Sequence, residues 1–249
     1  MTAAGLPTSS TRHPSTRLLC ALRPTAAWLV RRWWRVDVHR ADRVPASGGV
    51  ILAANHVGVI DGPLLAVFAP RPVHALTKQE MFAGPLGGFL RRSGQISLDR
   101  FAADPGAIRS CLRVLRDGGA VGIFPEGTRG DGELRRFHHG AAYLALVTGA
   151  PVVPVTMIGT RPPGGGSNAL PSREGGVDIV VGTPWRTAQQ AWPRTREQVR
   201  ATSALLREHM LTEVGDALAL TRRSLPGPLP AGQSEDDPDT GLVDQTREL

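Results

Sequence analysis

Short apolar runs recur along the chain at fairly regular intervals, and seven of them are predicted to be strands. Several are separated by segments in which apolar residues have helical spacing. The predicted strands are Arg35–His39, Gly49–Ala54, Pro72–Leu76, Gln95–Leu98, Ala120–Phe124, Pro151–Met157 and Val177–Val181.

Three segments between or after these strands carry the start and stop signals of helices. The first follows Asp104-Pro105, an N-cap and first-turn pair, and ends before Gly118-Gly119. The second spans His139–Thr148, and the third begins at the capping-box pair Thr195 and Gln198. Strands that alternate with helices predict an α/β fold, with a mostly parallel or mixed central sheet of about seven strands flanked by helices.

Residues 16–43 are predicted to form an N-terminal amphipathic helix and a lead-in strand, and no acid occurs before Asp37. One interpretation is an interfacial helix, with tryptophans at headgroup depth and arginines facing anionic lipid. The other is a helix packed on the domain with a basic outer face, and Pro24 is expected to kink or split either helix. The side chains concerned are Trp28, Trp33, Trp34, Arg17, Arg23, Arg31, Arg32 and Arg35.

The two ends differ in composition from the α/β domain, which is expected to span residues 44–220. Residues 1–15 are predicted to be a disordered N-terminus, and residues 225–249 a disordered acidic tail. Glycine and prolines interrupt the longest uncharged stretch, Gly140–Thr160, and arginines interrupt the apolar runs near the start. Neither a membrane span nor a signal peptide is therefore predicted.

Charge is unevenly distributed along the chain. The net charge is +7, and residues 233–249 hold six acids and one base, so their −5 leaves +12 on the other 232 residues. A body this basic favours anionic membrane, nucleic acid or phosphate-bearing substrates. No nucleic-acid-binding module is recognisable and few aromatic rings are available for stacking, so no nucleic acid partner is expected. Two distant cysteines, Cys20 and Cys111, favour a reducing cytosol.

The first candidate for chemistry is an Asn-His pair that follows the strand Gly49–Ala54, with Asp61 five residues after His56. This spacing suits a turn in which the acid folds back toward the imidazole. A carboxylate that fixes the tautomer and stabilises the imidazolium is the arrangement of a general base. Taken alone, the pair is a weak signal, because a histidine beside an acid is often a satisfied turn.

Three further stretches follow or form strands. Arg100 ends the stretch G-Q-I-S-L-D-R, where it could hold a phosphate or pair with a surface acid. In I-F-P-E-G-T-R-G, residues 123–130, Glu126 can accept from substrate hydroxyls, while Arg129 and backbone N–H groups can receive phosphate oxygens. P-V-V-P-V-T-M-I, residues 151–158, is expected to build the wall of a pocket.

Together, these four stretches resemble the four sequence blocks of the glycerolipid acyltransferase family, of the 1-acylglycerol-3-phosphate acyltransferase type. The resemblance covers residues 44–160, with all four blocks in order. Between the first two blocks, A-L-T-K-Q-E-M-F-A-G-P-L-G, residues 75–87, is also similar to the family.

The resemblance implies a reaction and a role for each matching residue. His56 would be the general base that deprotonates the free hydroxyl of a lysolipid, and Asp61 would orient and support it. The oxygen would attack the thioester of acyl-CoA or acyl carrier protein, with no acyl-enzyme, cofactor or metal. The other matches concern the acceptor: glycerol phosphate binding by Arg100, Glu126 and Arg129, a phosphate contact by Lys78, and a turn shaped by Gly127 and Thr128.

We therefore expect an O-acyltransferase of phospholipid synthesis that converts lysophosphatidate to phosphatidate. Its expected partners are a lysophospholipid, an acyl thioester, with acyl carrier protein as one donor, and an anionic membrane surface. Its expected place is the cytoplasmic face of the membrane, as a peripheral or monotopic protein.

Several alternatives stay open. Val57 and Gly58 stand where family members often have a serine or another polar residue, so the turn is expected to be less polar and more flexible. The identity of the acceptor lipid therefore stays open. Another lysolipid or glycerol 3-phosphate is one alternative, and a silent lipid- or CoA-binding protein is another. A serine hydrolase is disfavoured because no G-x-S-x-G occurs.

Three segments outside the four blocks keep more than one interpretation. The glycine-rich stretch 161–176 could close over a substrate or be a plain surface loop. The apolar stretch 81–90 could line an acyl tunnel, touch the bilayer or form a core helix. His138-His139 invites a metal interpretation, but no third ligand stands at a telling spacing and no metal is expected.

Overall fold

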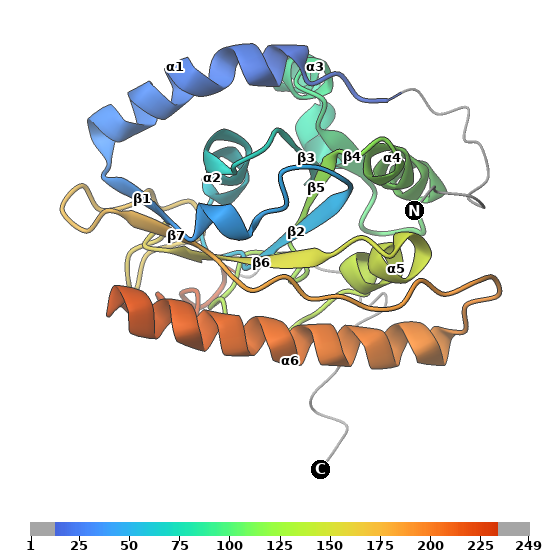
Figure 1. Ribbon diagram of the computed structural model, residues 1–249. Coiled ribbons are helices and arrows are strands. Elements are labelled where there is room, and N and C mark those ends of the chain that lie inside the picture. The colour runs from blue at the N-terminus through green and yellow to red at the C-terminus, as the bar shows by residue number, and fades with distance from the viewer. Residues whose placement is uncertain (1–12, 234–249) are drawn as a thin grey trace.

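Seven strands form one mixed sheet in the computed structural model, which describes residues 13–233 (Figure 1). They are β1 (Val36–His39), β2 (Val50–Ala54), β3 (Val73–Lys78), β4 (Ile96–Leu98), β5 (Ala120–Ile123), β6 (Val152–Ile158) and β7 (Val177–Val181). Their order across the sheet is β1-β7-β6-β2-β5-β3-β4. All seven coincide closely with predicted strands, and the predicted α/β fold is confirmed.

Five of the strands run in one direction. β2 to β6 are joined by parallel pairing, whereas β7 is antiparallel to β6 and β1 is parallel to β7. β2 lies between β5 and β6, and all of its residues are buried. Alternate side chains of a strand point to opposite faces, so Ile51 and Ala53 enter one core while Val50, Leu52 and Ala54 enter the other.

Six α-helices accompany the sheet within residues 13–233: α1 (Arg17–Trp33), α2 (Asp61–Phe68), α3 (Gly84–Arg92), α4 (Pro105–Arg116), α5 (Gly140–Thr148) and α6 (Arg196–Thr221). α1 and α2 cover one face, and α4, α5 and α6 cover the other (Figure 1). The expected caps are present. The Asp104 side chain accepts from the N–H of Ala107 at 2.9 Å, and Thr195 and Gln198 form both bonds of the capping box.

The N-terminal helix differs from the prediction in its continuity and in the inward direction of Arg23 and Trp34. α1 continues through Pro24 as one helix, so the expected split does not occur. Arg23 donates to carbonyls at the C-terminal end of α2, which are the groups that a helix leaves without intrahelical partners. Trp34 is also turned inward and donates its indole N–H to a carbonyl of the loop after β6 at 2.9 Å. Trp28 and Trp33 are exposed.

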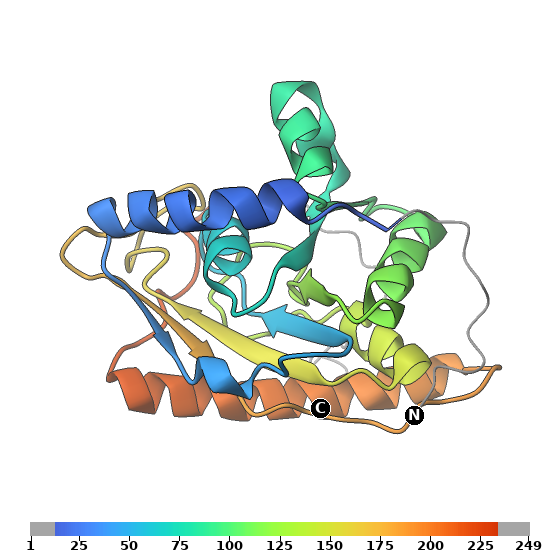
Figure 2. The same cartoon turned by 45° about the horizontal axis from the view of Figure 1, so that its top comes forward.

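The segment 81–90 does not form a core helix. A 3₁₀ turn, Gln79–Phe82, leads into α3, which projects from the body of the molecule (Figure 2). Leu86 and Phe89 are 46% and 47% exposed, and Gly87 is the buried residue of this helix. The apolar side chains of α3 therefore face outward.

The C-terminal segment stays on the body beyond the predicted start of the tail. Leu225 packs against the core under α5 and α6, and the carbonyl of Gly227 accepts from Arg161. The expected tail, 225–249, therefore begins with residues that contact the fold, and its acidic part, 234–249, lies outside the described residues, as do residues 1–12. Among residues 13–233, no helix combines the length and the apolar character that crossing a bilayer requires.

Candidate active site

The segments selected from the sequence meet at one edge of the sheet. Because β2 to β6 are parallel, their carboxyl ends share this edge, where ligands of open α/β folds bind. His56 and Asp61 follow β2, Lys78 ends β3 and Arg100 follows β4. The turn 124–130 follows β5, and the loop 159–176 follows β6.

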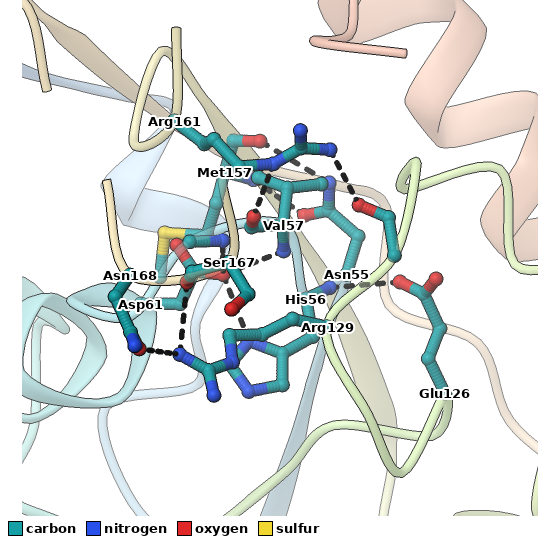
Figure 3. A network of polar contacts seen from close by, with 12 residues as sticks. Asn55, His56, Val57, Asp61, Glu126, Arg129, Met157, Arg161, Ser167 and Asn168 are labelled. Atoms are coloured by element: carbon teal, nitrogen blue, oxygen red, sulfur yellow. Dashed lines mark hydrogen bonds and ion pairs between the residues drawn. The ribbon is translucent and has the colours of Figure 1, made fainter. Parts of the chain in front are cut away.

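His56 and Asp61 are in direct contact (Figure 3). Nδ1 of His56 lies 2.9 Å from Oδ2 of Asp61, which also accepts the N–H groups of Val57 at 2.7 Å and Gly58 at 2.8 Å. Because Oδ2 acts as an acceptor, we assign the proton to Nδ1 and the lone pair to Nε2. The Asp61 side chain is fully buried, whereas that of His56 is 21% exposed. Such an imidazole can take a proton on its exposed side.

Gly58 is closely packed in this turn. A Cβ at this position would lie 2.7 Å from the carbonyl oxygen of Thr160, beyond the end of β6. The absence of a side chain therefore lets the turn after β2 approach the backbone after β6 closely.

Glu126 lies behind the histidine. Its side chain is buried, and Oε1 accepts the backbone N–H of His56 at 2.7 Å (Figure 3). Burial raises the pKa of Glu126 to about 8, although the bond from His56 acts in the opposite direction. The carbonyl of His56 accepts from the N–H of Gly130 at 2.8 Å. Together, Glu126 and Gly130 hold the His56 backbone, and the contact of Glu126 with substrate hydroxyls stays a prediction.

Lys78, Arg100 and Arg129 form a cluster of positive charge. Burial lowers the pKa of Lys78, and the charges of Arg100 and Arg129 lower it further. Nη1 of Arg100 donates to the carbonyl of Gly127 at 2.9 Å, in a turn where Gly127 has a left-handed φ of 73° and Thr128 is buried. Three positive charges this close together favour the binding of an anion with more than one negative charge, such as a phosphate.

The glycine-rich loop after β6 contacts this cluster. Nη1 of Arg129 donates to the carbonyl of Ser167 at 2.8 Å and to Oδ1 of Asn168 at 2.9 Å (Figure 3). The loop 161–176 therefore reaches the site. No sequence motif marks Asn168.

The sequence interpretation gave no role to two further residues of the site. The Asn55 amide pairs with the backbone of Met157 in β6, accepting at 2.6 Å and donating at 3.1 Å. Arg161 is 1% exposed and donates to four backbone carbonyls around the site. The available signals were positional, since Asn55 adjoins His56 and Arg161 follows a parallel strand closely, as Arg100 does.

Comparisons with known proteins agree on one family. A family model described as "Acyltransferase" matches residues 35–158. The 1-acyl-sn-glycerol-3-phosphate acyltransferase of Bacillus subtilis is 30% identical over 179 residues, which cover 70% of this chain and 86% of that protein. The enzyme of the same name from Borreliella burgdorferi is 31% identical over 132 residues, 51% of this chain and 52% of the relative.

A solved structure has the same fold. The crystal structure of the 1-acyl-sn-glycerophosphate (LPA) acyltransferase from Thermotoga maritima aligns with a TM-score of 0.60 at 22% identity. The alignment covers 81% of this chain and 80% of that one.

Proposed function

The chain belongs to the glycerolipid acyltransferase family and is an O-acyltransferase, and we propose that it transfers a fatty acyl group from an acyl thioester to the free hydroxyl of lysophosphatidate. The product would be phosphatidate. The names of the relatives from B. subtilis and B. burgdorferi support lysophosphatidate as the acceptor.

The observation that carries the proposal is the 2.9 Å contact between Nδ1 of His56 and the buried Asp61. Nε2 takes the proton of the acceptor hydroxyl as its oxygen attacks the thioester carbonyl, and Asp61 stabilises the resulting imidazolium. The tetrahedral intermediate then expels the thiolate, which recovers the proton from His56. A new ester bond replaces the thioester bond, and the histidine returns to its neutral form.

The cluster of Lys78, Arg100 and Arg129 would hold the phosphate of the acceptor. A phosphate monoester carries up to two negative charges, so its binding would relieve the repulsion that these cations exert on one another. With the phosphate fixed there, the free hydroxyl of the same small glycerol unit would be presented to His56, and such positioning supplies much of the rate.

The donor would be acyl-CoA or an acyl carrier protein, and we propose no cofactor and no metal. A thioester is already activated toward attack, so a positioned base and aligned substrates suffice for transfer.

We also propose that the enzyme works at an anionic membrane surface on the cytoplasmic side. α1 exposes Trp28 and Trp33, at 63% and 55%, beside the exposed Arg32. Indole rings settle at headgroup level, and arginines are attracted to anionic lipid. α3 projects on the same side of the molecule (Figure 2), and its Leu86 and Phe89 side chains are exposed. Attachment there would bring the site to a lipid acceptor.

Acyl transfer followed by lipid mass spectrometry tests the proposal. The full chain is offered long-chain acyl-CoA or acyl carrier protein, with lysophosphatidate, other lysophospholipids and glycerol 3-phosphate on liposomes. Phosphatidate is the expected main product. A different acylated lipid would support acyl transfer and identify another acceptor. The absence of product with every donor would contradict the proposal and favour a binding protein.

A further inference from the structure

A buried arginine lies behind the turn that holds His56 and Asp61. Arg161 is the largest of the fully buried side chains among residues 13–233. A guanidinium taken out of water must have its charge and its N–H groups compensated. Burial lowers the pKa of Arg161, and the negative charges of Asp131 and Asp61 act in the opposite direction.

The N–H groups of Arg161 are compensated by four backbone carbonyls, and Figure 3 shows the contact with Val57. Nε donates to Val57 at 2.8 Å and Nη1 to Gly165 at 2.8 Å, while Nη2 donates to Gly130 at 2.9 Å and Gly227 at 2.6 Å. These carbonyls belong to the turn after β2, the loop after β6, the turn after β5 and the segment after α6. One rigid, planar group thus joins four segments that are distant in the sequence.

Two of these bonds connect directly to the proposed catalytic pair. The peptide unit between Val57 and Gly58 accepts from Arg161 through its oxygen and donates to Asp61 through its N–H, at 2.8 Å in each case. Gly130 also accepts from Arg161 through its carbonyl, and it donates its N–H to the carbonyl of His56 at 2.8 Å. The first path from the guanidinium to the pair passes through one peptide unit, and the second passes through one residue, Gly130.

The other contacts of Arg161 lead to the cationic cluster. Gly130 directly follows Arg129, and Gly165 lies in the loop whose Ser167 and Asn168 accept from the Arg129 side chain. The guanidinium therefore lies between the segment that carries the base and the segments that surround Arg129.

We propose that Arg161 is a positioning residue for acyl transfer, which fixes the turn of His56 and Asp61 relative to the turn that carries Arg129. The inference rests on the proposed roles of His56 and of the cationic cluster. Because Arg161 is buried, it acts through the backbone of the neighbouring segments and has no contact with substrate. A displacement of the base relative to the bound acceptor by about 1 Å can cost on the order of 100-fold in rate.

Arg71 provides a matched control at the opposite edge of the sheet. Its guanidinium also joins backbone carbonyls, those of Pro45 and Gly48 at 2.9 and 2.8 Å and that of Gly118. These carbonyls precede β2 and β5, away from the carboxyl ends that form the site. A lysine at either position keeps the charge and loses the planar fork of donors.

The test compares Arg161→Lys with Arg71→Lys, with Arg161→Met as a second variant, by thermal unfolding and by kcat and KM per folded molecule. We expect kcat of Arg161→Lys to fall by about 10- to 100-fold, with KM for the thioester within about threefold of the parent. Arg71→Lys should lower the melting temperature and keep kcat within about twofold.

Equal kcat values for folded Arg161→Lys and Arg71→Lys would overturn the inference and leave Arg161 a purely structural residue. So would a loss of kcat that follows the melting temperature equally in both variants. A parent protein that acylates no acceptor would instead refute the proposed function, so the two failures are distinguishable.

Discussion

Two residues of the turn after β5 hold the backbone of His56 from both sides. Glu126 accepts its N–H and Gly130 donates to its carbonyl. The His56 ring also packs against Phe124 of the same segment, with 4.5 Å between ring centroids. The contribution of Glu126 to catalysis is therefore expected to come from the position of the histidine, and a neutral acceptor of the same shape should replace it.

Replacement of Glu126 by glutamine tests this role through the pH dependence of stability. Burial raises the pKa of Glu126 from 4.5 to about 8, so between these values the folded chain holds a proton that the unfolded chain has released. The free energy of unfolding of the parent should therefore fall as the pH rises through this window. Glu126→Gln lacks this ionisation, and its stability relative to the parent should increase from pH 5 to pH 8.5.

Urea unfolding at both pH values measures this difference. Glu126→Gln should also keep acyl transfer better than Glu126→Ala, because the amide oxygen can still accept the N–H of His56. The same stability difference at pH 5 and pH 8.5 would refute the buried, protonated state of Glu126.

At the scale of elements, α1 has a packed inner side and an exposed outer side, so the two interpretations of this helix are compatible. Its inner side packs on the domain through Ala27 and Val30, the adjoining Trp34 packs there too, and Arg23 caps the end of α2. Its outer side leaves Trp28 and Trp33 exposed. A helix held this firmly can present its outer side chains to a membrane without leaving the fold.

Alanine substitution of the outer tryptophans tests the membrane contact. Trp28→Ala with Trp33→Ala should weaken binding to vesicles that contain anionic lipid by roughly tenfold, because interfacial affinity scales with the apolar area inserted. The folded domain should be retained, since both side chains are exposed. Vesicle co-sedimentation measures the effect.

Trp192→Ala is the matched control for α1. Trp192 is 79% exposed and precedes α6, the helix on the opposite face of the sheet. An equal loss of binding in Trp192→Ala would show that exposed tryptophans act without regard to position, and would contradict α1 as the membrane contact.

For the molecule as a whole, the strands and the meeting of the motifs were predictable for one physical reason. Apolar runs define the strands, and the carboxyl ends of parallel strands share one edge, so residues after such ends converge. Local spacing also predicted that Asp61 would turn back toward His56, and the structure brings these side chains together.

The remaining features depend on relations that a single sequence does not display. The direction of Glu126 depends on the turn at Gly127, and Arg161 depends on three segments distant in the sequence as well as on its own loop. The outward side chains of α3 were not predictable, because apolar and glycine-rich residues occur both in cores and at surfaces.

The most direct test of the account is acyl transfer by His56→Ala with His39→Ala as control. His39 forms a similar pair, with Nε2 2.7 Å from Oδ1 of Asp178, on β1 and β7, which β6 separates from β2. Because a positioned base contributes about 10²- to 10⁴-fold, His56→Ala should lose at least 100-fold in kcat while remaining folded, and His39→Ala should transfer at nearly the parent rate. A folded His56→Ala with near-parent activity would contradict the account.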